Sequence, residues 1–169
     1  MAAVVRPARP GEGARLGEIF LASGRAVWAR HLSPVGLAGV RSPADEWERR
    51  IADPDVISLV AEHRGRVAAL AVLSRSPDED ADPALVALLD RLYVEPAAWR
   101  RGLGQALVDA SMKELKGRRF RELTLWTAEW SASRGFYEAT GWSLDGATRQ
   151  TSFAGGTFAE VRYRTAVRA

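Results

Sequence analysis

The segment Leu92 to Leu107, LYVEPAAWRRGLGQAL, constrains the fold more than any other part of the chain. Residues 85–94 are apolar enough to predict a buried strand, and Pro96, which cannot supply a ladder N–H, lets that strand end or splay. A turn with two glycines then leads into a helix, because apolar residues over 103–115 recur on one helical face. The chain is therefore expected to place a strand, a glycine-bearing turn and a long helix in direct succession.

The hydrophobic periodicities on either side of this segment predict one mixed α/β domain over residues 1–169. The expected fold has a largely antiparallel sheet of six to seven strands, flanked by about four helices. Strands are expected over 3–6, 56–61, 67–73, 85–94, 123–126, 147–153 and 157–165, and helices over 10–28, 42–52, 103–117 and 131–137. The stretch 33–41 breaks the pattern, Ser42 and Ser131 are the expected helix N-caps, and Gly117 is the expected left-handed residue at a helix end.

Composition and charge exclude several classes of protein. Hydrophobic residues make up 47% of the chain and charged residues 27%, which indicates a globular domain that requires neither a disulfide nor a metal. No apolar run approaches a membrane span of ~20 residues, and the N-terminus lacks a secretory signal. The chain contains no cysteine, so we expect a cytoplasmic protein without thiolate chemistry. With a net charge of only +3 and arginines scattered among carboxylates, we expect no nucleic-acid and no membrane partner.

Gly102 and Gly104 make the turn suitable for an anionic ligand. A residue without Cβ lets the backbone approach a ligand, and the free N–H groups at a helix N-terminus attract anions such as pyrophosphate. The loop lacks the lysine and Ser/Thr of a Walker A motif, and two glycines are too few for the dinucleotide fingerprint. Taken alone, RRGLG is equally compatible with a plain tight turn between a strand and a helix.

The turn resembles the cofactor motif of the GNAT superfamily of N-acetyltransferases, a strand ending in V-x-P followed by [Q/R]-x-x-G-x-[G/A] at a helix start. Val94, Pro96, Gly102 and Gly104 match this motif in register, whereas Trp99 stands at the Gln/Arg position. The resemblance implies a GNAT fold and acetyl-CoA as cosubstrate. By resemblance, the CoA pyrophosphate binds the turn residues Arg100, Arg101, Gly102, Leu103, Gly104 and Gln105, and the pantetheine and thioester bind Leu92, Tyr93 and Val94.

A second segment, SASRGFYEATG over residues 131–141, is similar to the family's A-x-x-F-Y-E-x-x-G-F signature. The two motifs occur in the family's order, with a strand between them. Cleavage of a thioester by an amine needs a proton for the departing thiolate, and a phenol with a pKa near 10 is a reasonable donor. Tyr137 is therefore the candidate acid, and Phe136 is assigned to the core. Trp130 replaces an asparagine often found in the family, which leaves one polar contact to the cofactor in question.

The general base is left open between two carboxylates and none. Asp90 shares strand parity with Leu92 and Val94, so its side chain is expected on their side of the sheet. Glu129, just past the next strand, is the second candidate. In a third alternative, the enzyme captures an amine that is already neutral, and no base is needed.

The acceptor is the part of the function that the sequence constrains least. By resemblance, the stretch with Trp28, Arg30 and His31 borders the acceptor pocket, although His31 is equally an ordinary surface histidine. The acidic loop 78–82 either attracts a cationic amine or is only a solvated loop, and we favour the second interpretation. The acceptor is expected to be an amine on a small molecule or a peptide, and six tryptophans leave a homodimer open.

These features together predict an acyltransferase that moves an acetyl group from acetyl-CoA to a primary amine by direct attack in a ternary complex. The chain has no cysteine to carry the usual covalent intermediate. The alternative is a non-catalytic GNAT-fold module that binds acyl-CoA or regulates another protein. The missing asparagine and the absence of a clear base favour this alternative.

Overall fold

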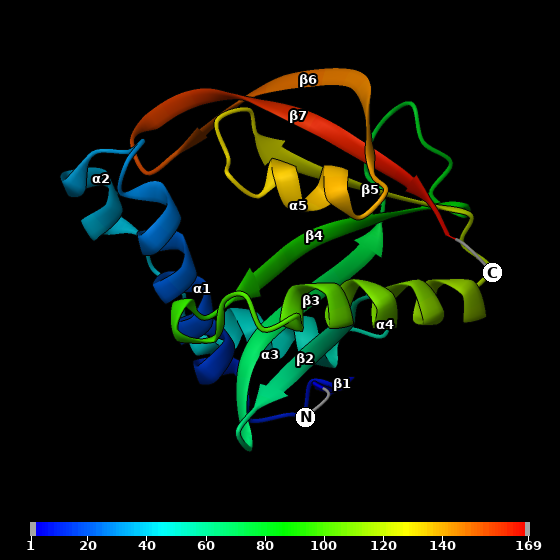
Figure 1. The fold of residues 1–169 in the computed structure, drawn as a ribbon, viewed down its shortest axis with the longest axis horizontal. Coiled ribbons are helices and arrows are strands. Elements are labelled where there is room, and N and C mark those ends of the chain that lie inside the picture. The colour runs from blue at the N-terminus through cyan, green and yellow to red at the C-terminus, as the bar shows by residue number, and fades with distance from the viewer. Residues whose placement is uncertain (1–2, 168–169) are drawn as a thin grey trace.

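Seven strands form one sheet in the order β1-β2-β3-β4-β5-β7-β6 in the computed structural model, which describes residues 3–167 (Figure 1). The strands are β1 (Val4–Pro7), β2 (Ile57–His63), β3 (Arg66–Arg75), β4 (Val86–Val94), β5 (Glu122–Ala128), β6 (Ser143–Phe153) and β7 (Gly156–Ala166). Neighbouring strands are antiparallel except β4 and β5, which are parallel. This arrangement confirms the predicted mixed, largely antiparallel sheet.

Helices cover both faces of the sheet (Figure 1). On one face, α1 (Gly13–Trp28) and α3 (Ala44–Ala52) pack on the central strands, and on the other face lie α4 (Leu103–Gly117) and α5 (Arg134–Ala139). Because both faces are covered, β3 is buried almost from end to end, which explains its uninterrupted apolar sequence VAALAVL. Within residues 3–167, no helix is long and apolar enough to cross a membrane.

Two hairpins close on turns whose central residues both have positive φ. Arg64 and Gly65 join β2 to β3 with φ angles of 54° and 75°, and Ala154 and Gly155 join β6 to β7 with φ angles of 50° and 76°. Positive φ at both central positions is characteristic of the two-residue hairpin turn that matches strand twist. Both turns lie between strands that the sequence predicts, over 56–61 and 67–73 and over 147–153 and 157–165.

The stretch 33–41, expected to be irregular, contains a short helix, α2 (Pro34–Gly39). The side chain of Ser33 accepts a hydrogen bond from the Gly36 N–H at 3.1 Å, so this Ser-Pro pair starts a helix. The same pair at Ser42 and Pro43 behaves differently, since the Ser42 hydroxyl accepts from the Trp47 indole instead of capping α3.

Two further helix ends differ from expectation. Gly117 is the last residue of α4, and the left-handed residue that follows the helix is Arg119, with φ of 68°. Helix α5 begins at Arg134 rather than directly after Ser131, whose hydroxyl accepts from the Ser133 N–H in the preceding turn. Local sequence patterns therefore locate these helices correctly but miss their ends by a few residues.

Candidate active site

The parallel strands β4 and β5 pair over three residues and then separate. Their register runs from Val86 opposite Glu122 to Leu88 opposite Thr124, although β4 continues to Val94 and β5 to Ala128. The open part of β4 remains paired with β3 on its other side, as far as Ala69 opposite Val94. The separation leaves one edge of β4 free, and it creates a gap in the middle of the sheet.

The free edge of β4 consists of the backbone groups of Leu92 and Val94. The Glu95 N–H donates to the Ala68 carbonyl of the β3 side at 2.8 Å. Because backbone groups of successive residues alternate in direction along a strand, those of Tyr93 also point to β3, and those of Leu92 and Val94 point into the gap. The gap is therefore lined by peptide donors and acceptors suited to an amide-containing ligand.

The Val94 carbonyl is already bound by two side chains that sequence reasoning missed. The Ser23 hydroxyl and the Trp99 indole N–H both donate to this oxygen, each at 2.6 Å. Trp99, which departs from the family motif, thus ties the end of β4 to the turn before α4. No local signal in the sequence could have identified Ser23, which lies 71 positions before Val94.

A cavity of about 640 Å³ occupies the gap and extends to the start of α4. Among its lining residues are the predicted site residues Asp90, Leu92, Tyr93, Val94, Arg100, Gly102, Leu103, Gly104, Gln105 and Tyr137. Arg101 lies on the exposed turn and does not line the cavity. The fold therefore brings the two sequence motifs together on one cavity, although most of α4 and the whole of β5 separate them along the chain.

The turn before α4 presents backbone N–H groups to this cavity. Arg100 and Gly102 adopt positive φ angles of 59° and 77°, which reverses the chain before the helix begins at Leu103. Among the described residues, no side chain caps the start of α4, so its first N–H groups remain available for an anion. A Cβ at Gly104 would lie 3.7 Å from the Phe136 ring, so the helix approaches α5 here at close range.

Tyr137 of α5 faces the same cavity and is otherwise enclosed by aromatic rings. Its ring contacts those of Phe136, Trp142 and Tyr163, with centroid separations of 5.4 to 5.8 Å. Burial raises the pKa of the Tyr137 phenol well above its ordinary value, and the neighbouring Tyr93 raises it further, while Ser133 opposes the shift. The phenol is therefore protonated throughout the neutral pH range and can donate a hydrogen bond into the cavity.

Asp90 occupies a β-bulge, which overturns the parity expected for it. Val72 pairs with Arg91 and Leu73 with Leu89, so Asp90 is the extra residue of β4. Leu92 and Val94 pack in the core beneath α4, whereas the Asp90 carboxylate reaches Arg50 of α3 on the opposite face. It still lines the cavity, which passes through the gap between the two faces.

Both Asp90 oxygens accept hydrogen bonds from guanidinium groups. Arg50 donates to one oxygen at 2.9 Å and Arg91 to the other at 2.7 Å. Glu129, the second candidate base, is exposed and lines neither this cavity nor the one next to it. Glu160 of β7, which the sequence analysis did not single out, borders the neighbouring cavity instead.

The neighbouring cavity, of about 440 Å³, adjoins the first and shares Trp28, Asp90, Tyr93 and Trp126 with it. It lies between the end of α1, the open part of the sheet and the β6–β7 hairpin. Trp28 thus lines both cavities. His31, by contrast, is exposed and stacks on Trp130, with a centroid separation of 4.0 Å.

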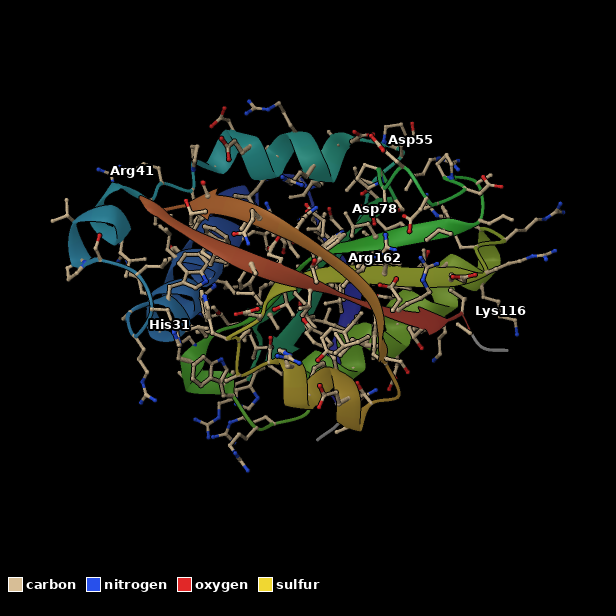
Figure 2. The ribbon with its side chains drawn as sticks, turned by 90° about the horizontal axis from the view of Figure 1, so that it is seen from above. His31, Arg41, Asp55, Asp78, Lys116 and Arg162 are labelled. Atoms are coloured by element: carbon tan, nitrogen blue, oxygen red, sulfur yellow. The ribbon has the colours of Figure 1, made fainter. Side chains whose placement is uncertain are left out.

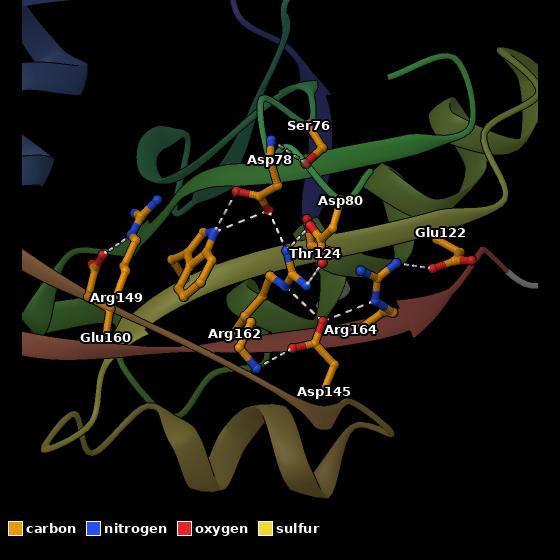
Figure 3. A network of polar contacts seen from close by, with 12 residues as sticks. Ser76, Asp78, Asp80, Glu122, Thr124, Asp145, Arg149, Glu160, Arg162 and Arg164 are labelled. Carbon is orange, nitrogen blue, oxygen red and sulfur yellow. Dashed lines mark hydrogen bonds and ion pairs between the residues drawn. The ribbon is translucent and has the colours of Figure 1, made fainter. Parts of the chain in front are cut away.

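The acidic loop 78–82, expected to be solvated, forms ion pairs with a buried arginine (Figures 2 and 3). Arg162 of β7 has a side chain only 5% exposed and forms ion pairs with Asp78, Asp80 and Asp145. Asp78 also accepts from the Trp126 indole N–H at 3.1 Å, and Trp126 lines both cavities. The loop therefore helps to hold Trp126 in its place in the wall of both cavities.

Comparison with known proteins is consistent with this geometry. Residues 24–142 match the model of the Acetyltransferase (GNAT) family, a range that contains both motifs. The structure superposes on PaiA N-acetyltransferase from Thermoplasma acidophilum, solved in complex with coenzyme A, with a TM-score of 0.80 and 17% identity, covering 98% of this chain and 99% of that chain. It also superposes on the ribosomal-protein-S18-alanine N-acetyltransferase from Escherichia coli, with a TM-score of 0.73 and 16% identity, covering 99% and 96%.

A comparison with curated protein sequences finds no match. The identities to the solved structures are low, so these structures establish the fold alone. The family model matches more than half of the chain and covers the β4 strand, the glycine turn and Tyr137. The protein therefore belongs to the GNAT family of acetyltransferases.

Proposed function

We propose that this protein transfers an acetyl group from acetyl-CoA to a primary amine by direct attack in a ternary complex. The observation that carries the proposal is one cavity lined by the free edge of β4, the N-terminal turn of α4 and the Tyr137 side chain. The complex of PaiA N-acetyltransferase with coenzyme A supports the choice of donor. In this proposal acetyl-CoA supplies the activated acyl group, and the protein supplies binding, orientation and a proton.

The donor half of the site has the polar groups that acetyl-CoA requires. The free N–H groups at the start of α4, with the backbone of residues 100–105, would hold the pyrophosphate, and exposed Arg100 and Arg101 add positive charge. The backbone groups of Leu92 and the Val94 N–H would hold the pantetheine amides. Because the Val94 carbonyl already accepts two hydrogen bonds, Val94 is proposed to contribute chiefly its N–H.

Tyr137 is the proposed acid. The amine nitrogen forms a bond to the thioester carbonyl carbon, the carbon–sulfur bond breaks, and the sulfur leaves as a thiolate that takes a proton. A buried, protonated phenol that lines the same cavity as the β4 edge is placed to donate this proton. The proton lost by the attacking nitrogen passes to a base or to solvent, from which the phenol is reprotonated.

Asp90 remains the proposed base, with its carboxylate fixed at the gap by two arginines. Asp90→Asn should lower kcat/KM. Arg50→Met is the matched control, because it breaks one ion pair and leaves the carboxylate in place. If Arg50→Met lowers the rate as much as Asp90→Asn does, Asp90 acts through its ion pairs and is not the base.

The test of the proposal combines binding and turnover. Acetyl-CoA should raise the melting temperature, and a panel of primary amines should release CoA thiol with intersecting initial-velocity patterns. Tyr137→Phe should lower kcat strongly while the KM for acetyl-CoA changes little. An unchanged kcat in this variant would remove Tyr137 as the acid, and no thermal shift at millimolar acetyl-CoA would overturn the donor site.

A second candidate, a module that binds acyl-CoA without turnover, is favoured by one observation. Both Asp90 oxygens are engaged by arginines, as in a structural ion pair. Such a module would show the thermal shift and would release no thiol with any amine. The two measurements together therefore separate the enzyme from the binder.

A further inference from the structure

Seven aromatic residues line the 440 Å³ cavity beside the proposed acetyl site, together with four charged side chains and four serines or threonines. These rings are Phe20, Trp28, Tyr93, Trp126, Trp130, Phe153 and Phe158. Many of these rings pack on one another. Phe20 and Trp28 make an edge contact, as do Trp130 and Phe158, each with a ring-centroid separation of 5.3 Å. The rings hold one another in place, so an aromatic part of the wall, beside the polar groups, is formed before any ligand enters.

One end of the cavity is bounded by contacts between the N-terminal helices and the C-terminal hairpin. Trp28 of α1 packs edge-on against Phe153 with a ring-centroid separation of 4.7 Å, and His31 stacks on Trp130. Helix α2 lies beside the β6–β7 turn (Figure 1), where a Cβ at Gly36 would meet the Ala154 carbonyl oxygen at only 1.7 Å. These contacts close the cavity at this end.

The charges around the cavity are matched. Its carboxylates are Asp90 and Glu160, and two arginines, Arg91 and Arg149, line it as well. Arg91 pairs with Asp90 and Arg149 with Glu160, each at 2.7 Å. A ligand with several ammonium groups would meet these guanidinium groups and find no free carboxylate among the lining residues to balance them.

Burial is the largest cause of the raised pKa of the Tyr93 phenol; Arg91 opposes it, and Asp90 and Glu160 both add to it. Tyr93 and Asp90 border both cavities, so they lie beside the proposed acetyl site. An acceptor amino group bound beside Tyr93 and Asp90 would lie next to the acetyl group.

We propose that the acceptor is a small primary amine with one positive charge and a flat aromatic body, of the arylalkylamine class. Its ring lies among Trp28, Trp130 and Phe158, and its amino group lies at Tyr93 and Asp90, beside the gap in the sheet. This inference rests on the proposed acetyl transfer and adds its substrate class. It also explains Trp130, which replaces the family's usual asparagine and here forms part of the acceptor wall.

The test is the rate of CoA thiol release with four amines: 2-phenylethylamine, propylamine, spermidine and a short peptide with a free N-terminus. The value of kcat/KM should be at least ~10-fold higher for 2-phenylethylamine than for each of the others, because only its ring contacts the aromatic walls. Spermidine or the peptide as the best substrate would overturn the inference and leave acetyl transfer standing. No thiol release with any of the amines, despite binding of acetyl-CoA, would overturn the proposed function instead.

Variants of the aromatic wall provide the second measurement. Trp130→Ala and Phe158→Ala should each raise the KM for 2-phenylethylamine at least ~5-fold, with little change in the KM for propylamine or acetyl-CoA. Trp130→Phe should restore most of the loss. The control is Leu144→Ala, since Leu144 is exposed and lines neither cavity. Equal KM changes for 2-phenylethylamine and propylamine would show that Trp130 and Phe158 do not contact the phenyl ring. This result would overturn the proposed class of acceptor.

Discussion

Replacing Arg162 with methionine should destabilise the protein more than any other single loss of charge in the loop network. The Arg162 side chain is 5% exposed, and its partners Asp78 and Asp145 are 10% and 16% exposed. Methionine fills similar space but leaves these buried carboxylates without their cation, a loss that typically costs 3–5 kcal/mol. Asp80 is mostly exposed and Asp145 keeps Arg164, so we expect the lower end, about 3 kcal/mol.

Urea denaturation measures this change directly. The midpoint should fall with little change in the slope, and the melting temperature should drop by ~6–12 °C for a chain of this size. The control is Arg49→Met, because Arg49 and Asp45 form an exposed pair, with side chains 67% and 69% accessible, and should cost less than ~0.5 kcal/mol. A loss below about 1 kcal/mol for Arg162→Met, or one equal to the control, would refute the network's structural role.

Acid should weaken the same network. The hydrogen bond from Arg162 lowers the pKa of Asp80 from 3.8 to about 2. The stabilisation of the fold by this pair is therefore complete above pH 3.8 and is lost as the pH falls through about 2. Burial alone would raise the pKa of Asp145, but hydrogen bonds from Ala147, Arg164 and Arg162 lower it overall. Asp145→Asn should therefore make the free energy of unfolding depend less on pH in the acid range. Gly104→Ala places a Cβ at ordinary contact distance and should preserve the thermal shift with CoA, whereas Gly104→Val should abolish it by obstructing the turn. Gly24→Ala would put a Cβ 2.2 Å from the Trp28 ring, so it should destabilise the fold by ~1–3 kcal/mol and raise the KM for the amine.

Features that depend on nearby residues could be predicted from the sequence. The strand, turn and helix around Gly102 follow from local apolar periodicity and from a conformation that glycine adopts at no cost. The Ser-Pro pairs show the limit of local signals, because Ser33 caps a helix and Ser42 does not. The difference is the Trp47 indole, which captures the Ser42 hydroxyl.

Features that depend on distant residues could not be predicted. The bulge at Asp90 exists only in the register with β3, and it moves the carboxylate to the opposite face from Leu92. The acidic loop looked solvated because Arg162, its cation, follows more than 80 residues later. The hydrogen bond from Ser23 to Val94 is equally nonlocal. In each case the sequence contains the right residue types, but only the fold determines which of them meet.

We propose that the protein transfers an acetyl group to an amine bound in the cavity between β4 and β5. This proposal is tested most directly by incubating the protein with acetyl-CoA and 2-phenylethylamine and measuring thiol release together with the mass of the amine. We expect one thiol released for each amine that gains an acetyl group, and neither product with Gly104→Val. Binding of acetyl-CoA without thiol release for any primary amine would contradict it.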